Sequence, residues 1–473
     1  MRHKLTLKLF TSNNQLKKTL NGSLFLKKKL TLEIMKKYYK LPFILLLFFP
    51  ALLSAQKSWS LEECIHYAWE NNLQIQQQEL AVEQSNNNLY QAKMNYVPTI
   101  SASINHSMNW GRSVNVQDLE IIENKLSQST SASARAAINL FEGFTKTNEV
   151  KSNSVQLEIS RSGVEKLRND ISVEIARSYL QILLSKEILN TAKQSITSAQ
   201  EQVERTKKLV DAGSVAYSSY LEVLSQLATE KLQVINAQNQ LRTSLLTLKQ
   251  LLDLEGSSEF DIAQIDVDFL VKEYIGESIE KLYSISKSLP QIKVAELNLE
   301  NSGLQLAIAK GSLYPSISFS AGYGSYYSDS RDQAFFDQFN DNRNPSLGFG
   351  MNIPIFNNYR VKTNVKNAKL SVRKAQIEYK SSLQLLYKDI QQAGNEALSL
   401  YEKYKASEQN VKAMEESFRY VQQKFDVGVL NATDYTVAKT NLFKAKSDYY
   451  QAKYQYVFQL KILDFYKGIP ISL

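Results

Sequence analysis

Pro98-Thr99-Ile100-Ser101, preceded by Ala92-Lys93, is the stretch of sequence that decides the fold, because it occurs twice. It returns in the second half of the chain as Pro315-Ser316-Ile317-Ser318, preceded by Ala309-Lys310. Two further pairs keep the same order: Ile138-Asn139-Leu140-Phe141 with Ile353-Pro354-Ile355-Phe356, and Asp211-Ala212-Gly213 with Asp426-Val427-Gly428. Matches in the same order over most of the chain indicate that one supersecondary unit was duplicated.

The helical patterning of each copy is far longer than a globular core requires. It predicts helices over residues 61–96, 145–210, 217–252, 279–313, 362–427 and 433–466. In the last of these, apolar residues recur at alternating steps of three and four, which is the 3.5-residue period of a coiled coil. At 1.5 Å per residue, the two longest helices would each reach roughly 100 Å. The helices alone would favour a filament or a scaffold.

The segments that follow Pro98 and Pro315 have a different period. From Ile100 to Trp110, every second residue is apolar or aromatic except His106, and the alternate positions are Ser or Asn. Similar alternation predicts strands at about 98–111, 127–141, 315–327 and 345–356, with polar connections at 111–126 and 329–344. A period of two with one apolar face fits tilted strands of a membrane barrel around a wet lumen. An ordinary antiparallel sheet over a core gives the same alternation.

The charge of the chain is concentrated in its first 55 residues. The formal net charge is +9, yet residues 1–55 hold eleven Lys or Arg and one acid, and the remainder holds 45 bases against 46 acids. A nucleic-acid partner would require a basic folded part, so none is expected. Lys36-Lys37, the apolar run 41–53 and Ser54-Ala55 have the order of a secretory signal peptide that starts at Met35, so we expect an exported protein.

No motif for catalysis or cofactor binding is present. The sequence has no phosphate-binding loop, dinucleotide glycine pattern, zinc-binding His pair or CxxC motif. Its single cysteine, Cys64, excludes an internal disulfide and is expected to be a small buried helix residue. The sequence therefore predicts no enzyme and no cofactor.

Several motifs, taken in order, resemble those of the TolC-type outer membrane efflux proteins over the whole mature length. They are Ser60-Leu61-Glu62-Glu63-Cys64-Ile65 at the first helix, the two helix-to-strand joints, Leu140-Phe141-Glu142-Gly143 and Ile355-Phe356-Asn357-Asn358 leaving strands, and the tips Val210–Ser214 and Phe425–Val429. Each motif is weak alone, and the resemblance is specific because the joints, strand exits and tips occur twice in one order.

The resemblance implies a mainly α-helical fold with transmembrane β-strands, built from two tandem repeats at 56–270 and 271–473. Four strands per chain cannot close a barrel and an open edge in lipid is forbidden, so three copies would form a twelve-stranded outer-membrane barrel. The resemblance also implies a long periplasmic helical barrel, a periplasmic adaptor (membrane fusion) protein, and an inner-membrane pump of the RND or ABC class. The function implied is a passive exit duct for efflux or type I secretion. A periplasmic coiled-coil scaffold is the alternative.

The two hairpin tips, at about 211–217 and 426–433, hold the predicted site residues. The resemblance implies adaptor contacts at Gly213, Ser214, Val215, Gly428, Val429 and Leu430. It also implies that Asp434, six residues after Gly428, forms a ring of carboxylates at the pore aperture. The family's second aspartate position is Val437 here, and the matching position of the first copy is Ser219, so one ring is expected and the family's salt-bridge latch is not supported. Alternatively, Asp434 only begins the last helix, where an acid suits the helix dipole.

Overall fold

A computed structural model describes residues 58–114, 121–254, 260–273, 276 and 278–473. The expected signal peptide lies outside the described residues. The first repeat consists of β1 (Ser58–Trp59), α2 (Leu61–Asn71), α3 (Leu73–Met94), β2 (Thr99–Val114), β3 (Ile121–Glu142), α4 (Thr145–Asp211) and α5 (Tyr217–Leu251). β4 (Asp261–Ile262) and a short 3₁₀ turn (Asp268–Leu270) end the first repeat. The second consists of α6 (Ile279–Ser286), α7 (Pro290–Gly311), β5 (Ser316–Ser328), α8 (Phe335–Asp341), β6 (Asn344–Asn352), α9 (Arg360–Asp426) and α10 (Ala432–Tyr466).

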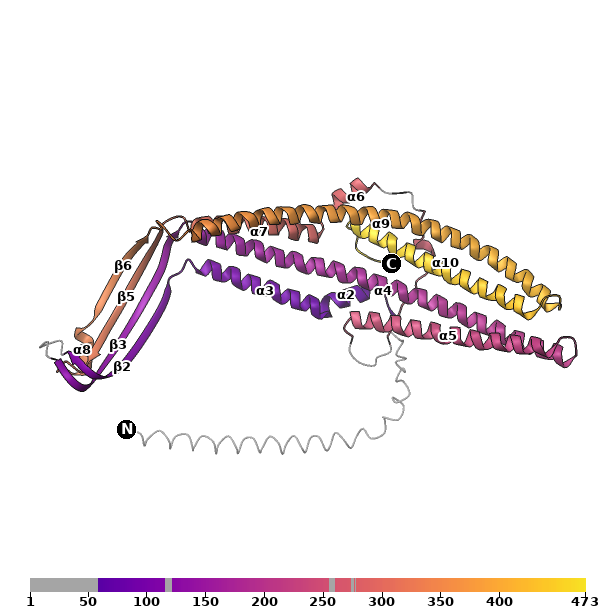
Figure 1. Cartoon of the computed structure of the whole chain (residues 1–473), viewed down its shortest axis with the longest axis horizontal. Helices are drawn as coiled ribbons and strands as arrows, with labels where there is room; N and C mark the ends of the chain where they lie inside the picture. Colours follow the sequence, from indigo (N-terminus) through magenta and orange to yellow (C-terminus); the bar gives the residue numbers. More distant parts are fainter. Residues whose placement is uncertain (1–57, 115–120, 255–259, 274–275, 277) are drawn as a thin grey trace, which may run out of the picture. The chain divides into compact units, whose positions relative to one another are not determined.

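The helices form a row, and its membership changes along its length. Next to the sheet the order is α3, α4, α7, α9, and towards the hairpin tips it is α5, α4, α10, α9 (Figure 1). The two 67-residue helices α4 and α9 run through both parts. The tandem repeat and the long helical hairpins predicted from the sequence are confirmed.

Two of the predicted helices are each divided in two. Residues 61–96 form α2 and α3, because the side chain of Asn72 accepts hydrogen bonds from the N–H groups of Gln74 and Ile75 and so caps a new helix. Residues 279–313 form α6 and α7, because Pro290 occupies the first turn of α7, where its missing N–H costs nothing. The single helices predicted here were wrong. No helix among the described residues has an apolar stretch long enough to cross a membrane.

The four long strands form one antiparallel sheet in the order β2-β3-β5-β6. The register places Ala136 opposite Ile100 and Ala321, and Ala321 opposite Leu347, so the apolar residues of all four strands share one face. This agrees with the alternation in the sequence.

The strand ends differ from the prediction. The structure extends β2 and β3 beyond the predicted loop boundaries, with Trp110 opposite Leu126 and Val114 opposite Ile121, and the register shifts after Gly111. The second connection contains α8, whose Gln338 is fully buried and donates to the carbonyls of Ser328 and Gln333. β6 ends at Asn352, so Ile353–Phe356 lie beyond the strand. The first predicted polar loop was therefore too long, because polar strand residues resemble loop residues in sequence, whereas the second has the predicted extent and contains a short helix.

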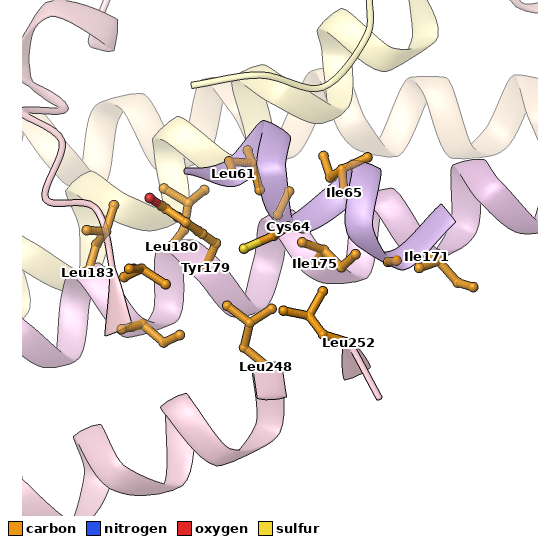
Figure 2. Close-up of a cluster of buried hydrophobic side chains, with 14 of the residues drawn as sticks. Leu61, Cys64, Ile65, Ile171, Ile175, Tyr179, Leu180, Leu183, Leu248 and Leu252 are labelled. Carbon is orange, nitrogen blue, oxygen red and sulfur yellow. The ribbon is translucent and has the colours of Figure 1, made fainter. Parts of the chain in front are cut away.

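The main hydrophobic cluster joins α2 and the start of α3 to the middle of α4 and the end of α5 (Figure 2). Cys64 is fully buried there, and burial raises the pKa of its thiol to about 12. Tyr179, also fully buried, donates its hydroxyl hydrogen to one of two backbone carbonyls in reach, Trp59 or Ala263. A thiol in this environment is protonated and inert, as expected for a packing residue.

The joint between β3 and α4 depends on two glycines in close contact. Gly143 has a φ of +61°, and a Cβ on it would overlap the carbonyl oxygen of Gly311 at the end of α7. Gly143→Ala should therefore lower the free energy of unfolding by about 1–3 kcal/mol, because it adds strain and forces the two backbones apart. The heat stability of the purified protein measures this effect. Gly303→Ala, on an open face of α7, is the control, and equal stability of the two variants would contradict the prediction.

Candidate functional site

Both hairpin tips have the same backbone construction. Gly213 (φ +71°) donates its N–H to Val210, and Ser214 donates to Leu209; Gly428 (φ +76°) donates to Phe425, and Val429 donates to Lys424. These paired bonds close each preceding helix in a Schellman motif, which requires a left-handed residue. The two glycines thus have the chain-reversing role expected from the sequence.

The predicted adaptor-contacting residues lie on these two reversals. Gly213, Ser214, Gly428 and Val429 are exposed, whereas Val215 and Leu430 are half-buried. The second tip presents Val427 (73% exposed) and Val429 (74% exposed), which is a large apolar surface for so short a turn. Their contact with an adaptor stays a prediction.

Asp434 is the third residue of α10, and its environment is compatible with both predicted roles. Its N–H donates to the side chain of Asn431, 2.8 Å away, so Asn431 caps the helix. The side chain of Asp434 is exposed, and no described residue forms an ion pair with it. An exposed acid in the first turn favours the helix dipole and leaves the carboxylate available to other groups.

One ion pair connects the two hairpins close to the tips. Arg205 of α4 lies 2.5 Å from Asp426, the last residue of α9, between side-chain nitrogen and oxygen. In the sequence, Asp426 stands out only as part of a repeated motif, and its counterpart Asp211 has no ion pair among the described residues. The contact therefore links the two repeats close to their tips.

A second polar cluster, missed in the sequence, is buried between α4, α5 and α10. Lys439 donates to the carbonyl oxygen of Ser195 (2.9 Å), and its Nζ lies 3.9 Å from Glu230, whose Oε1 accepts from Gln226. The side chains of Lys439 and Glu230 are only 6% and 2% exposed. Burial lowers the pKa of Lys439, and Glu230 partly offsets this shift.

Lys439 is the first of three lysines at seven-residue spacing on α10. Lys446 pairs with Glu415 of α9 (2.9 Å), and Lys453 pairs with Asp268. Seven-residue spacing keeps the three on one helix face, beside the apolar seam. This periodicity was the signal in the sequence that could have indicated inter-helix ion pairs.

Nothing in the described geometry resembles a catalytic centre. No group of three or more potential metal ligands occurs among the described residues. Three other features stand out in the described residues. They are a sheet with an exposed apolar face, a row of long helices whose outermost helices pack on one side only, and two hairpin tips that each end in a Schellman motif.

Comparison with known proteins agrees with this picture. The family model of the outer membrane efflux proteins matches residues 64–253 and 282–468. Outer membrane efflux protein BepC of Brucella suis is 22% identical over 402 residues, covering 82% of each chain. Outer membrane protein TolC of Vibrio cholerae is 21% identical over 290 residues, which is 60% of this chain and 64% of the relative. The alignment thus spans somewhat less than two thirds of that relative.

The solved structure of CusC, described in connection with folding and transmembrane channel formation, has the same fold. It superposes with a TM-score of 0.75 at 18% identity, covering 87% of this chain and 92% of that one. These matches confirm the resemblance to outer membrane efflux proteins, the outer-membrane location with a periplasmic extension, and the efflux role. The relatives are channel proteins rather than enzymes. Because the family model matches both repeats, the chain belongs to the outer membrane efflux protein family.

Proposed function

We propose that three copies of this chain form the exit duct of a tripartite efflux or type I secretion system. The observation that carries the proposal is the order of elements along the chain. Next to the sheet the row ends in α3 and α9, near the tips it ends in α5 and α9, and the sheet ends in β2 and β6. Along its whole length the chain therefore has two different edges. One edge is formed by β2, α3 and α5, and the other by β6 and α9.

Such a chain has two different sides, and joining unlike sides of successive copies generates a ring if the rotation closes. Both sides carry exposed apolar residues: Leu73, Leu80 and Tyr90 on α3, Leu221, Leu224, Leu232 and Ile235 on α5, and Leu370 and Ile377 on α9. A contact between copies would remove these side chains from water. Three copies bring twelve strands, and closure removes the two strand edges that lipid does not tolerate.

The exposed face of the sheet favours a channel over a soluble scaffold. Ile100, Ile104, Trp110, Leu347 and Phe349 are each 75–80% exposed. A soluble protein rarely exposes so large a contiguous apolar surface, whereas lipid would cover it. The energy for transport would come from an inner-membrane pump, of the RND or ABC class, through a periplasmic adaptor that contacts the two tips.

The mass of the purified mature protein in detergent tests the assembly. We expect three copies per particle, and extraction from membranes only with detergent. A monomeric particle that is released without detergent would support the scaffold instead. Deletion of the gene should also sensitise cells to hydrophobic toxins or block export of a polypeptide.

The aperture proposal concerns Asp434. Three copies of this carboxylate near the axis of a ring would attract cations in a narrow neck. Asp434→Ala should then increase leak conductance and reduce cation preference in planar bilayers. A capping role alone would predict unchanged conductance and a loss of helix stability of about 1 kcal/mol. Glu416→Ala, an exposed acid on α9 that pairs only within its own helix, is the matched control.

A further inference from the structure

The first part of α9 carries a charge excess that the duct function does not explain. Residues 360–388 contain eight Lys or Arg and one acid, Glu378. The matching part of α4 in the first repeat, residues 145–173, contains five bases and four acids. Since the two helices arose from one unit, the excess is a property of α9 and not of the repeat.

Five of these bases form one line along the helix. Lys362, Lys366, Lys369, Arg373 and Lys380 follow each other at steps of four, three, four and seven, which places them on one face. All five are exposed, and none forms an ion pair with a described residue. We call this set the basic stripe. It begins beside the sheet and extends roughly 27 Å along α9.

The basic stripe does not face either lateral neighbour directly. At roughly 100° per residue, the buried residues Val361 and Ala375 mark the side of α9 that faces α7. The exposed apolar residues Leu370 and Ile377 lie on the opposite side, where a second copy would pack. The stripe lies between these two sides, so it occupies one of the two surfaces of the helical wall.

The handedness of the sheet identifies that surface, given the proposed ring. The N–H of Asp329 donates to the carbonyl of Gln128, so the even-numbered residues of β3 from Thr130 to Ile138 direct their backbone groups towards β5. For L-residues, this places β5 to the left of β3 when the apolar face is viewed with the helices below. α7 then lies to the right of α9. Viewed from its N-terminal end beside the sheet, α9 turns clockwise as it runs away, and the stripe follows the α7-facing side in that direction. The stripe therefore points outward, towards the same side as the apolar face of the sheet.

A neighbouring copy could neutralise only a small part of this charge. The side that would adjoin α9 is α3, whose acids are Glu79 and Glu83. Glu79 already pairs with Arg168 at 2.9 Å. Two acids, one of them already paired, therefore leave most of the stripe without a counter-charge.

We propose that the basic stripe is a docking surface for an anionic polymer of the periplasm, namely the carboxylate-bearing peptide stems of the cell wall. The inference rests on the outward orientation in the proposed ring and on the outer-membrane location. A line of charges at one-turn and two-turn spacing fits repeated carboxylates better than one lipid headgroup. Lys380 lies twenty residues into α9, roughly 30 Å beyond its start, where membrane lipid does not reach.

Co-sedimentation of the purified full-length channel with purified peptidoglycan sacculi tests the proposal. Replacing the five stripe residues by Gln should weaken binding on the order of tenfold, and moderate salt should weaken wild-type binding similarly, because exposed charges are screened. The control replaces five exposed lysines elsewhere, Lys193, Lys207, Lys208, Lys231 and Lys444, and should bind as the wild type does.

Three results would overturn the proposal. The stripe variant could bind sacculi as the wild type does. It could lose binding only to vesicles of anionic phospholipid, which would make the partner a lipid. It could change ion selectivity in planar bilayers, which would place the stripe inside the duct. Detergent mass and conductance of the same variant test the duct separately, so failure of the duct and failure of the docking surface are distinguishable.

Discussion

Lys439→Met is expected to lower the free energy of unfolding by about 3–5 kcal/mol per copy, because it leaves Glu230 charged and buried without its cation. Glu230 retains one hydrogen bond, from Gln226, and its second oxygen has no partner among the described residues. Lys439 also bridges α10 of the second repeat to α4 and α5 of the first. The heat and denaturant stability of the purified channel measures the loss.

Replacing both partners separates the ion pair from simple packing. Lys439→Met combined with Glu230→Leu should recover most of the stability, because a buried ion pair replaced by apolar residues is often neutral or stabilising. Lys444→Met, at an exposed position of the same helix, should change stability by less than about 0.5 kcal/mol. If Lys439→Met lowers the free energy of unfolding no more than Lys444→Met does, the buried ion pair does not contribute to the stability of the fold.

The buried lysine also illustrates what the sequence could not predict. The 3.5-residue period predicted α10 and its seam, because apolar side chains recur there. A lysine beside that seam is usually a solvated charge, and its burial depends on Glu230, which is 209 positions away in the chain. The seven-residue spacing of the lysines indicates inter-helix pairing, but it does not identify Glu230 as the partner, because only the packing of three helices from two repeats brings these residues together.

Element ends show the same division between local and non-local causes. Gly213 and Gly428 predicted the tips, because a chain reversal with positive φ is a local requirement. The extension of β2 and β3 past Gly111 depends on cross-strand pairing, and the polar residues there resemble a loop. Asn72 is a strong capping residue, but apolar residues on both sides continued the helical period and concealed the break.

The candidate site was predictable only in outline. The sequence identified the tips and Asp434, and the predicted roles of these residues come from resemblance. The inter-repeat pair of Arg205 and Asp426 was not predictable, because nothing near Arg205 in the sequence distinguishes it from other exposed bases of α4.

Phe349→Arg is expected to abolish assembly in the outer membrane. Phe349 lies in the middle of β6, packs against Phe319 at a ring distance of 4.9 Å, and is 77% exposed on the apolar face. In the proposed barrel this face meets lipid, and an arginine near the bilayer mid-plane costs about 2–4 kcal/mol per copy. A ring of three copies incurs this cost three times, about 6–12 kcal/mol, which is comparable with the whole free energy of unfolding of a typical protein, about 5–15 kcal/mol.

Ser346→Arg is the matched control, because Ser346 lies on the same strand but on the opposite, polar face. A wet lumen should accept this arginine, so the variant should reach the outer membrane as trimers, with altered conductance at most. Heat-resistant trimers in isolated outer membranes are the readout for both variants. If Phe349→Arg assembles as well as Ser346→Arg, the apolar face does not meet lipid, and the sheet would have to be covered by protein instead.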